Sequence, residues 1–178
     1  MRNMIRPAGL LLALFAIAAV PVVGIASVAA TTPAPTAASQ GMPVFVKDIA
    51  PDAMPAVAVV DAFAAAIKAM KLEEAKALLD PAVLILESGG SERSRDEYMA
   101  EHAVADAAFM QNATQELRYR QAHASGDLAW VATESLLRGT DDGKPLALRS
   151  TETVVLRRTE AGWRIVHIHW SSRRVQGG

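Results

Sequence analysis

The sequence contains no cysteine, and this absence excludes several kinds of chemistry at once. Disulfides, thiolate nucleophiles, zinc sites with cysteine ligands and lipidated cysteines are all ruled out. An excess of positive charge is also missing, since the 178 residues carry a formal net charge of −1 at pH 7. Nucleic-acid binding generally depends on a basic surface, so this charge balance argues against a nucleic-acid partner.

Residues 1–30 have the pattern of an export signal peptide. Arginines precede an apolar run over residues 8–23, and Val28 and Ala30 stand where a signal peptidase expects small residues. An uncleaved membrane anchor is the alternative, because the run continued to Ala30 is long enough to span a bilayer. Pro21 and the small residues after it favour cleavage. We therefore expect a periplasmic or secreted protein that has no membrane contact once the signal is removed.

The next segment, residues 31–54, is rich in proline, alanine and threonine and is predicted to be a linker. From residue 55 the composition changes to that of a folded domain, which we place at residues 55–175. Helical spacing of apolar residues predicts helices over 56–70 and 72–79, and Ser94 with Glu97 forms a capping box that begins a third helix, over 94–110. Alternating apolar residues bounded by turn residues predict strands over 82–87, 114–123, 128–137, 146–158 and 163–172. Since the last four strands follow one another through short turns, we predict an α+β fold in which a curved antiparallel sheet wraps over three helices.

Four short motifs in this order resemble the nuclear transport factor 2-like superfamily, within which the chain is most similar to small bacterial SnoaL-like domains. These SnoaL-like domains are related to the association domain of calcium/calmodulin-dependent kinase. The motifs are Leu79-Asp80-Pro81, Glu87-Ser88-Gly89-Gly90, Ser94-Arg95-Asp96-Glu97-Tyr98 and Gly162-Trp163-Arg164-Ile165-Val166-His167-Ile168-His169-Trp170-Ser171. The resemblance implies a cone-shaped domain with an internal pocket and a homodimer formed through the outer face of the sheet. It implies no particular reaction, because one fold serves many functions.

The most suggestive candidate residues are His167 and His169, two apart in the last predicted strand. Alternation along a strand places them on one face together with Trp163 and Ile165. Imidazoles titrate near neutral pH, so the pair suits a proton shuttle, a pocket lining or a purely structural role at the sheet or the dimer interface. A metal site would need a third ligand that no sequence spacing supplies, so we predict neither a metal nor a cofactor.

Other candidates are polar residues that interrupt apolar stretches. Glu134 and Glu152 stand in the middle of predicted strands, where a carboxylate is either exposed or buried with a partner, for which Arg149, Arg120 or a histidine is available. Further pocket candidates are Tyr98 and His102, one helical turn apart, and Glu87 at a strand end.

Three functions are compatible with this pattern. The one we favour is small-molecule binding by an exported homodimer with an unidentified ligand. The alternatives are an enzyme of isomerase, dehydratase or cyclase type, which would use a pocket carboxylate and a histidine, and a structural dimerisation module.

Overall fold

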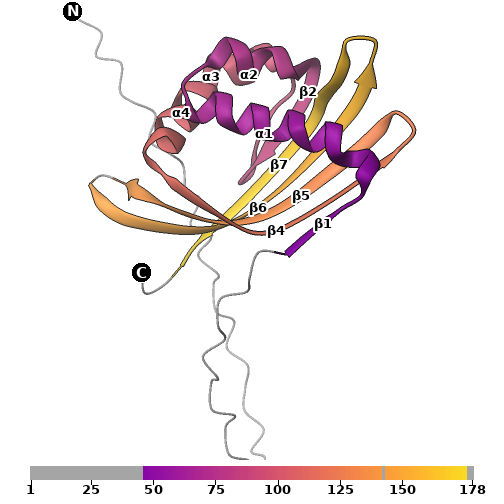
Figure 1. The fold of residues 1–178 in the computed structure, drawn as a ribbon. Coiled ribbons are helices and arrows are strands. Elements are labelled where there is room, and N and C mark those ends of the chain that lie inside the picture. Colours follow the sequence, from indigo (N-terminus) through magenta and orange to yellow (C-terminus); the bar gives the residue numbers. More distant parts are fainter. Residues whose placement is uncertain (1–45, 142, 176–178) are drawn as a thin grey trace, which may run out of the picture. The chain divides into compact units, whose positions relative to one another are not determined.

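The computed structural model describes residues 46–141 and 143–175, so the predicted signal peptide and most of the predicted linker lie outside the described residues. The described chain is an α+β domain in which a curved seven-stranded sheet carries helices on its concave face (Figure 1). This architecture confirms the predicted fold class. The elements in chain order are β1 (Val46–Ile49), a 3₁₀ turn (Pro51–Ala53), α1 (Met54–Lys68), α2 (Leu72–Leu78), β2 (Leu79–Glu87), β3 (Gly90–Glu92), α3 (Arg95–Glu101), α4 (Ala103–Asn112), β4 (Thr114–Ser125), β5 (Leu128–Asp141), β6 (Lys144–Thr159) and β7 (Gly162–Arg174).

Four consecutive antiparallel strands, β4 to β7, form the centre of the sheet, as the turn residues predicted. Gly126 and Gly162 adopt positive φ at two of the hairpin turns, a conformation that glycine adopts without steric cost. The remaining strands extend the sheet at both sides: β1 pairs parallel to β4, while β2 pairs parallel to β7 and antiparallel to β3. Strand β1 lies within the segment predicted as linker.

The third predicted helix is two helices, α3 and α4, separated by the single residue His102. The predicted capping box at its start is present, because the Ser94 hydroxyl accepts from the Glu97 amide at 3.1 Å. The Glu97 carboxylate in turn accepts from the Arg93 amide at 2.6 Å. At the break, the His102 ring turns toward the carboxylate of Glu92 in β3.

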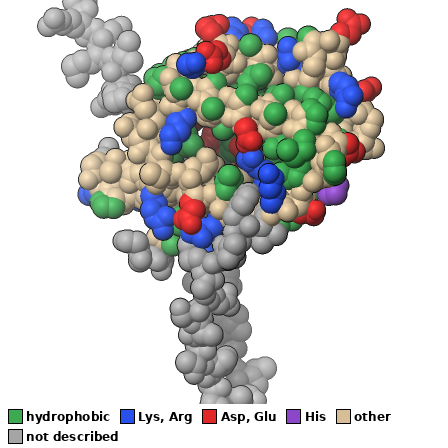
Figure 2. Space-filling model, in the orientation of Figure 1, with side chains coloured by type: hydrophobic (Ala, Val, Ile, Leu, Met, Phe, Trp, Pro, Cys, Tyr) green, Lys and Arg blue, Asp and Glu red, His purple; other side chains and the backbone are tan. Residues whose placement is uncertain are grey.

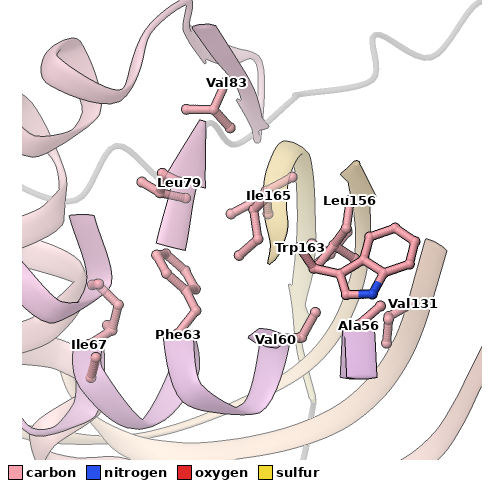
Figure 3. Packing of buried hydrophobic residues seen from close by; sticks show 14 of the residues in the cluster. Ala56, Val60, Phe63, Ile67, Leu79, Val83, Val131, Leu156, Trp163 and Ile165 are labelled. Atoms are coloured by element: carbon pink, nitrogen blue, oxygen red, sulfur yellow. The ribbon is translucent and has the colours of Figure 1, made fainter. Parts of the chain in front are cut away.

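Helix α1 supplies the helical half of the hydrophobic core. Its buried side chains, including Val60, Phe63 and Ile67, pack against residues of the concave sheet face such as Leu156 and Ile165 (Figure 3). The stripe follows the 3.6-residue period that the sequence shows, so α1 lies along the sheet with one face buried. Among residues 46–141 and 143–175, no helix covers the convex face of the sheet (Figure 1).

A bulge in β7 decides which of its side chains face inward. Leu156 of β6 is opposite Ile165, but the preceding residue of β6 is opposite His167, so Val166 is the extra residue. Such a bulge reverses the inside–outside alternation beyond it. Trp163 and Ile165 before the bulge are buried, whereas His169 after it is exposed. The prediction that the two histidines share a face with Trp163 and Ile165 is therefore wrong.

Candidate functional site

Five neighbouring strands each place one side chain at the same level of the concave face. The pairing register sets Arg120 of β4 opposite Thr133 of β5, Thr133 opposite Glu152 of β6, Glu152 opposite Trp170 of β7, and Trp170 opposite Glu87 of β2. We call these five residues the polar row. The side chains two positions away on the same strands belong to the core, which places the row on the inner face: Ala122, Val131, Val154, Ile168 and Ile85.

One end of the polar row carries a buried arginine. Arg120 is 8% exposed, and its Nε donates to Thr133 Oγ1 at 3.3 Å. Its Nη1 donates to Asp61 Oδ1 on α1 at 2.5 Å, so the arginine joins the sheet to the helix above it. Arg120 is thus the positive charge of the row.

The middle of the row is a carboxyl group held by an indole. Trp170 Nε1 donates to Glu152 Oε2 at 2.7 Å across the β6–β7 pair. Burial raises the pKa of Glu152 above its ordinary value, although the Trp170 hydrogen bond and the charge of Arg120 oppose that rise. The sequence left open whether Glu152 is exposed or buried with a partner. In the structure Glu152 is largely shielded from solvent, and its partner is the indole of Trp170.

At the other end of the polar row, three carboxyl groups lie close to one tyrosine and one histidine. We call these five residues the acidic cluster: Glu87, Glu92, Tyr98, His102 and Asp106. Burial raises the pKa of Glu87 to about 7, and the charges of Asp106 and Glu92 add to the rise while His102 opposes it. A carboxyl group that titrates near neutral pH can both take up and release a proton under physiological conditions. Glu87 is therefore the residue here best suited to acid–base chemistry.

Tyr98 is the most deeply buried member of the acidic cluster and connects it to the polar row. It is 1% exposed, its hydroxyl donates to Asp106 Oδ2 at 3.0 Å, and its ring lies 6.2 Å from that of Trp170. Burial raises the pKa of Tyr98, and Asp106 raises it further, so the phenol stays protonated and remains a donor. Burial also raises the pKa of Asp106, against the effect of the Tyr98 hydrogen bond.

Glu92 and His102 link the cluster to solvent. The Glu92 side chain is 3% exposed and its Oε1 contacts Nδ1 of His102, whose side chain is 52% exposed. Glu92 Oε2 is buried and has no hydrogen-bond partner among the described residues. Burial lowers the pKa of His102, but the hydrogen bond to Glu92 and its charge outweigh this, so the pKa lies above the ordinary value. A proton can reach the buried carboxylate through this ring.

A cleft of about 290 Å³ lies beside the arginine end of the row. Its walls come from β1, α1 and β4, and the Arg120–Asp61 ion pair is part of its lining. The space-filling view shows a hollow between the helices and the sheet on this side, with charged side chains beside it (Figure 2). The residues lining the cleft are Lys47, Ile49, Met54, Val57, Ala58, Asp61, Leu117 and Arg120.

Four of the eight predicted site residues come together here and four do not. Those on the helix-covered side of the sheet are Glu152, Glu87, Tyr98 and His102, the last at its solvent edge. The other four lie on the uncovered convex face: His167, His169, Glu134 and Arg149. The bulge at Val166 moves the histidines there, where the His167 ring contacts the Leu84 carbonyl at 2.8 Å.

Sequence reasoning missed Glu92, Asp106, Thr133 and Trp170 as site residues. Asp106 had a usable signal, since it follows His102 by one helical turn, as His102 follows Tyr98. Trp170 had none, because simple alternation places it on the face opposite to Ile165. In the described part of the chain no group of three histidine, aspartate or glutamate side chains is arranged to hold a metal ion.

The α+β fold is that of a SnoaL-like domain. The family model described as SnoaL-like domain matches residues 56–174, so the chain belongs to this family and the predicted resemblance is confirmed. No curated protein matches the chain. Within residues 46–141 and 143–175, no helix has both the length and the apolarity needed to cross a bilayer.

Solved structures give more particular likenesses. A candidate ketosteroid isomerase from Shewanella frigidimarina is 32% identical, with a TM-score of 0.63 over 70% of this chain and 99% of that one. A nuclear transport factor 2-like protein from Salmonella enterica is 19% identical, with a TM-score of 0.60 over 72% and 96% of the two chains. The association domain of the C. elegans kinase CaMKII is 20% identical, with a TM-score of 0.56 over 67% and 95%. The last two similarities show the fold alone.

Proposed function

We propose that this chain binds a small molecule on the concave face of its sheet and that the polar row recognises it. The row itself carries the proposal: five adjacent strands turn a polar group inward at one level of an otherwise apolar core. Burying such groups costs free energy that apolar residues would not cost. Convergent polar groups in an apolar concavity are the usual composition of a ligand site.

Ligand-dependent thermal unfolding tests this proposal. A library of cyclic ketones, hydroxy acids and aromatic acids should contain compounds that raise the melting temperature of the full chain. Replacing Trp170 by Phe removes the N–H that holds Glu152 while keeping a ring in place, so it should reduce that stabilisation. His169→Ala, on the convex face, is the matched control and should leave it unchanged. A melting temperature that no library compound raises, or a ligand-induced rise that is reduced equally in both variants, would count against the polar row as the binding site.

Acid–base catalysis of isomerase type is a second candidate, supported by the acidic cluster. Glu87 has a pKa of about 7, and Glu92 and His102 are in contact, so a carboxylate and a histidine converge as such chemistry requires. The 32% identity with a candidate ketosteroid isomerase also supports it. Exchange of the α-hydrogens of a bound cyclic ketone for deuterium, followed by NMR, should be accelerated by the protein and should fall at least tenfold in Glu87→Gln. Exchange at the rate of buffer alone would rule the candidate out.

We also infer that the protein is exported and forms a homodimer through its convex sheet face. The signal-like residues 1–30 support export, and a mature protein beginning at Thr31 is the expected result of intact-mass measurement on a periplasmic or secreted fraction. The dimer is supported by the uncovered convex face, where the large apolar side chains Leu84 and Trp130 are 39% and 37% exposed. The likeness to an association domain points in the same direction.

A further inference from the structure

The cleft beside Arg120 combines an apolar wall with a lining that has more positive than negative charges. Five of its eight lining side chains are apolar, from β1, α1 and β4: Ile49, Met54, Val57, Ala58 and Leu117. The other three are Lys47, Arg120 and Asp61, which give two positive charges and one negative. Its volume of about 290 Å³ is near the lower end of the range for small-molecule sites, so a fragment-sized molecule fits.

The guanidinium group of Arg120 is held in a position in which it can bind an anion. Its side chain is 10% exposed, and its position is fixed because Nε donates to Thr133 Oγ1 and Nη1 donates to Asp61. A guanidinium group has five N–H donors in one plane and matches the two oxygens of a carboxylate. Lys47, which lines the same cleft, makes no ion pair within the described part of the chain.

Asp61 is the group that an anionic ligand would displace. It accepts from Arg120 at 2.5 Å, but its side chain is 58% exposed, so water reaches it freely. An exposed carboxylate loses little when its ion pair opens, because solvent takes the place of its partner. The ligand carboxylate would then take over the contact with a guanidinium that is itself shielded from water.

We propose that this cleft binds a small amphiphilic carboxylate, with its carboxylate on Arg120 and Lys47 in place of Asp61 and its apolar body against Met54, Val57 and Leu117. This inference rests on the proposed binding function and names the chemical class of the ligand. An ammonium ligand would face the net positive charge of this lining, and a wholly apolar ligand would leave Lys47 without a counter-charge. Arg120 belongs both to the lining of this cleft and to the polar row, so the two adjoin.

The test is calorimetric titration of the full chain with 4-phenylbutyrate and with its neutral amide. We expect the carboxylate to bind at least tenfold more tightly than the amide and to lose affinity as sodium chloride is raised. Arg120→Met should lower the affinity for the carboxylate at least tenfold and leave the amide unaffected. Asp61→Asn should raise the affinity for the carboxylate severalfold, because the competing negative charge is gone while the side chain keeps its size. Equal binding of acid and amide, or no gain in Asp61→Asn, would overturn the proposal.

Two controls separate this inference from folding defects and from the broader proposal. Asn keeps a side-chain oxygen that can accept from Arg120, so Asp61→Asn should stay folded with only a small decrease in melting temperature. Lys71→Met, outside the cleft, should alter neither melting nor binding. If 4-phenylbutyrate does not bind but library compounds bind in a Trp170-dependent way, the carboxylate proposal is wrong and the proposed binding function is still supported. If 4-phenylbutyrate binds with the Asp61→Asn gain but no ligand depends on Trp170, the Glu152–Trp170 part of the polar row is not the binding site and the cleft at Arg120 is.

Discussion

Three carboxyl groups, those of Glu87, Glu92 and Asp106, lie close together at one end of the polar row. Burial raises the pKa values of Glu87 and Asp106, and the charge of Glu92 raises both further. The charge of His102 opposes the rise in both pKa values. Full ionisation of all three would place several negative charges in a poorly solvated space, which is unfavourable. The chain meets this cost by keeping part of the cluster protonated near neutral pH, and that protonation is what makes the cluster capable of proton transfer.

At the scale of the residue, we predict that stability falls as the pH rises from about 5 to 8. The folded protein holds the Glu87 proton with a pKa of about 7, against an ordinary value of 4.5, so its favourable contribution is complete below the ordinary value and is lost through pH 7. The raised pKa values of Asp106, Glu152 and His102 act in the same direction. Urea unfolding at several pH values measures this slope.

Glu87→Gln should flatten the slope, because glutamine cannot ionise. At pH 8 we expect it to be more stable than the wild type by roughly 1 kcal/mol, a value reduced by the partial exposure of Glu87 to solvent. Glu101→Gln, at an exposed position of α3, is the control and should retain the wild-type profile. Parallel wild-type and Glu87→Gln profiles would show that Glu87 is not the group responsible.

At the scale of the element, the start of α3 places Tyr98 and His102 over the sheet. Ser94 and Glu97 each satisfy a backbone amide at the helix terminus, at 3.1 and 2.6 Å. Ser94→Ala leaves the Glu97 amide without its acceptor and should cost about 1 kcal/mol of unfolding free energy. Ser125→Ala, at the exposed end of β4, should cost little by the same urea titration. Equal losses in the two variants would mean that the cap contributes nothing.

The bulge in β7 matters as much to the site as the cap does. It turns Ile168 into the core and brings Trp170 beside Glu152, while His169 points away. Without Val166 as an extra residue, regular alternation would bury the histidine and expose the tryptophan. A single inserted residue thus separates the aromatic and imidazole side chains of one short segment between the two faces of the sheet.

At the scale of the whole molecule, the uncovered convex face predicts self-association. Trp130 stacks near His123, with ring centroids 5.1 Å apart, and remains 37% exposed. Trp130→Asp should convert the dimer to a monomer in sedimentation velocity, because it places a charge within an apolar contact. Val104→Asp, which changes an exposed apolar residue of α4 instead, should leave the dimer intact. A monomeric wild type, or an unchanged dimer in Trp130→Asp, would contradict this prediction.

The sequence by itself determined the α+β class, the four central strands, the α1 core stripe and the capping box at Ser94. These features depend on local spacing, turn residues and capping chemistry, which act between residues close together in the chain. Glu152 could be recognised as a candidate because it interrupts an apolar strand, Tyr98 because it lies one helical turn from His102, and Glu87 because it stands at a strand end. The family resemblance was also legible in the motif that runs from Gly162 to Ser171.

Only the tertiary structure decided which of those candidates meet. Arg120 and Glu87 stand at opposite ends of one row because strand register aligns them across three intervening strands, and no local pattern fixes that register. The bulge at Val166 likewise follows from pairing with β6 and β2 rather than from the residues of β7 alone. Glu92, at the edge of the sheet, becomes part of the site only when α3 and α4 bring His102 against it.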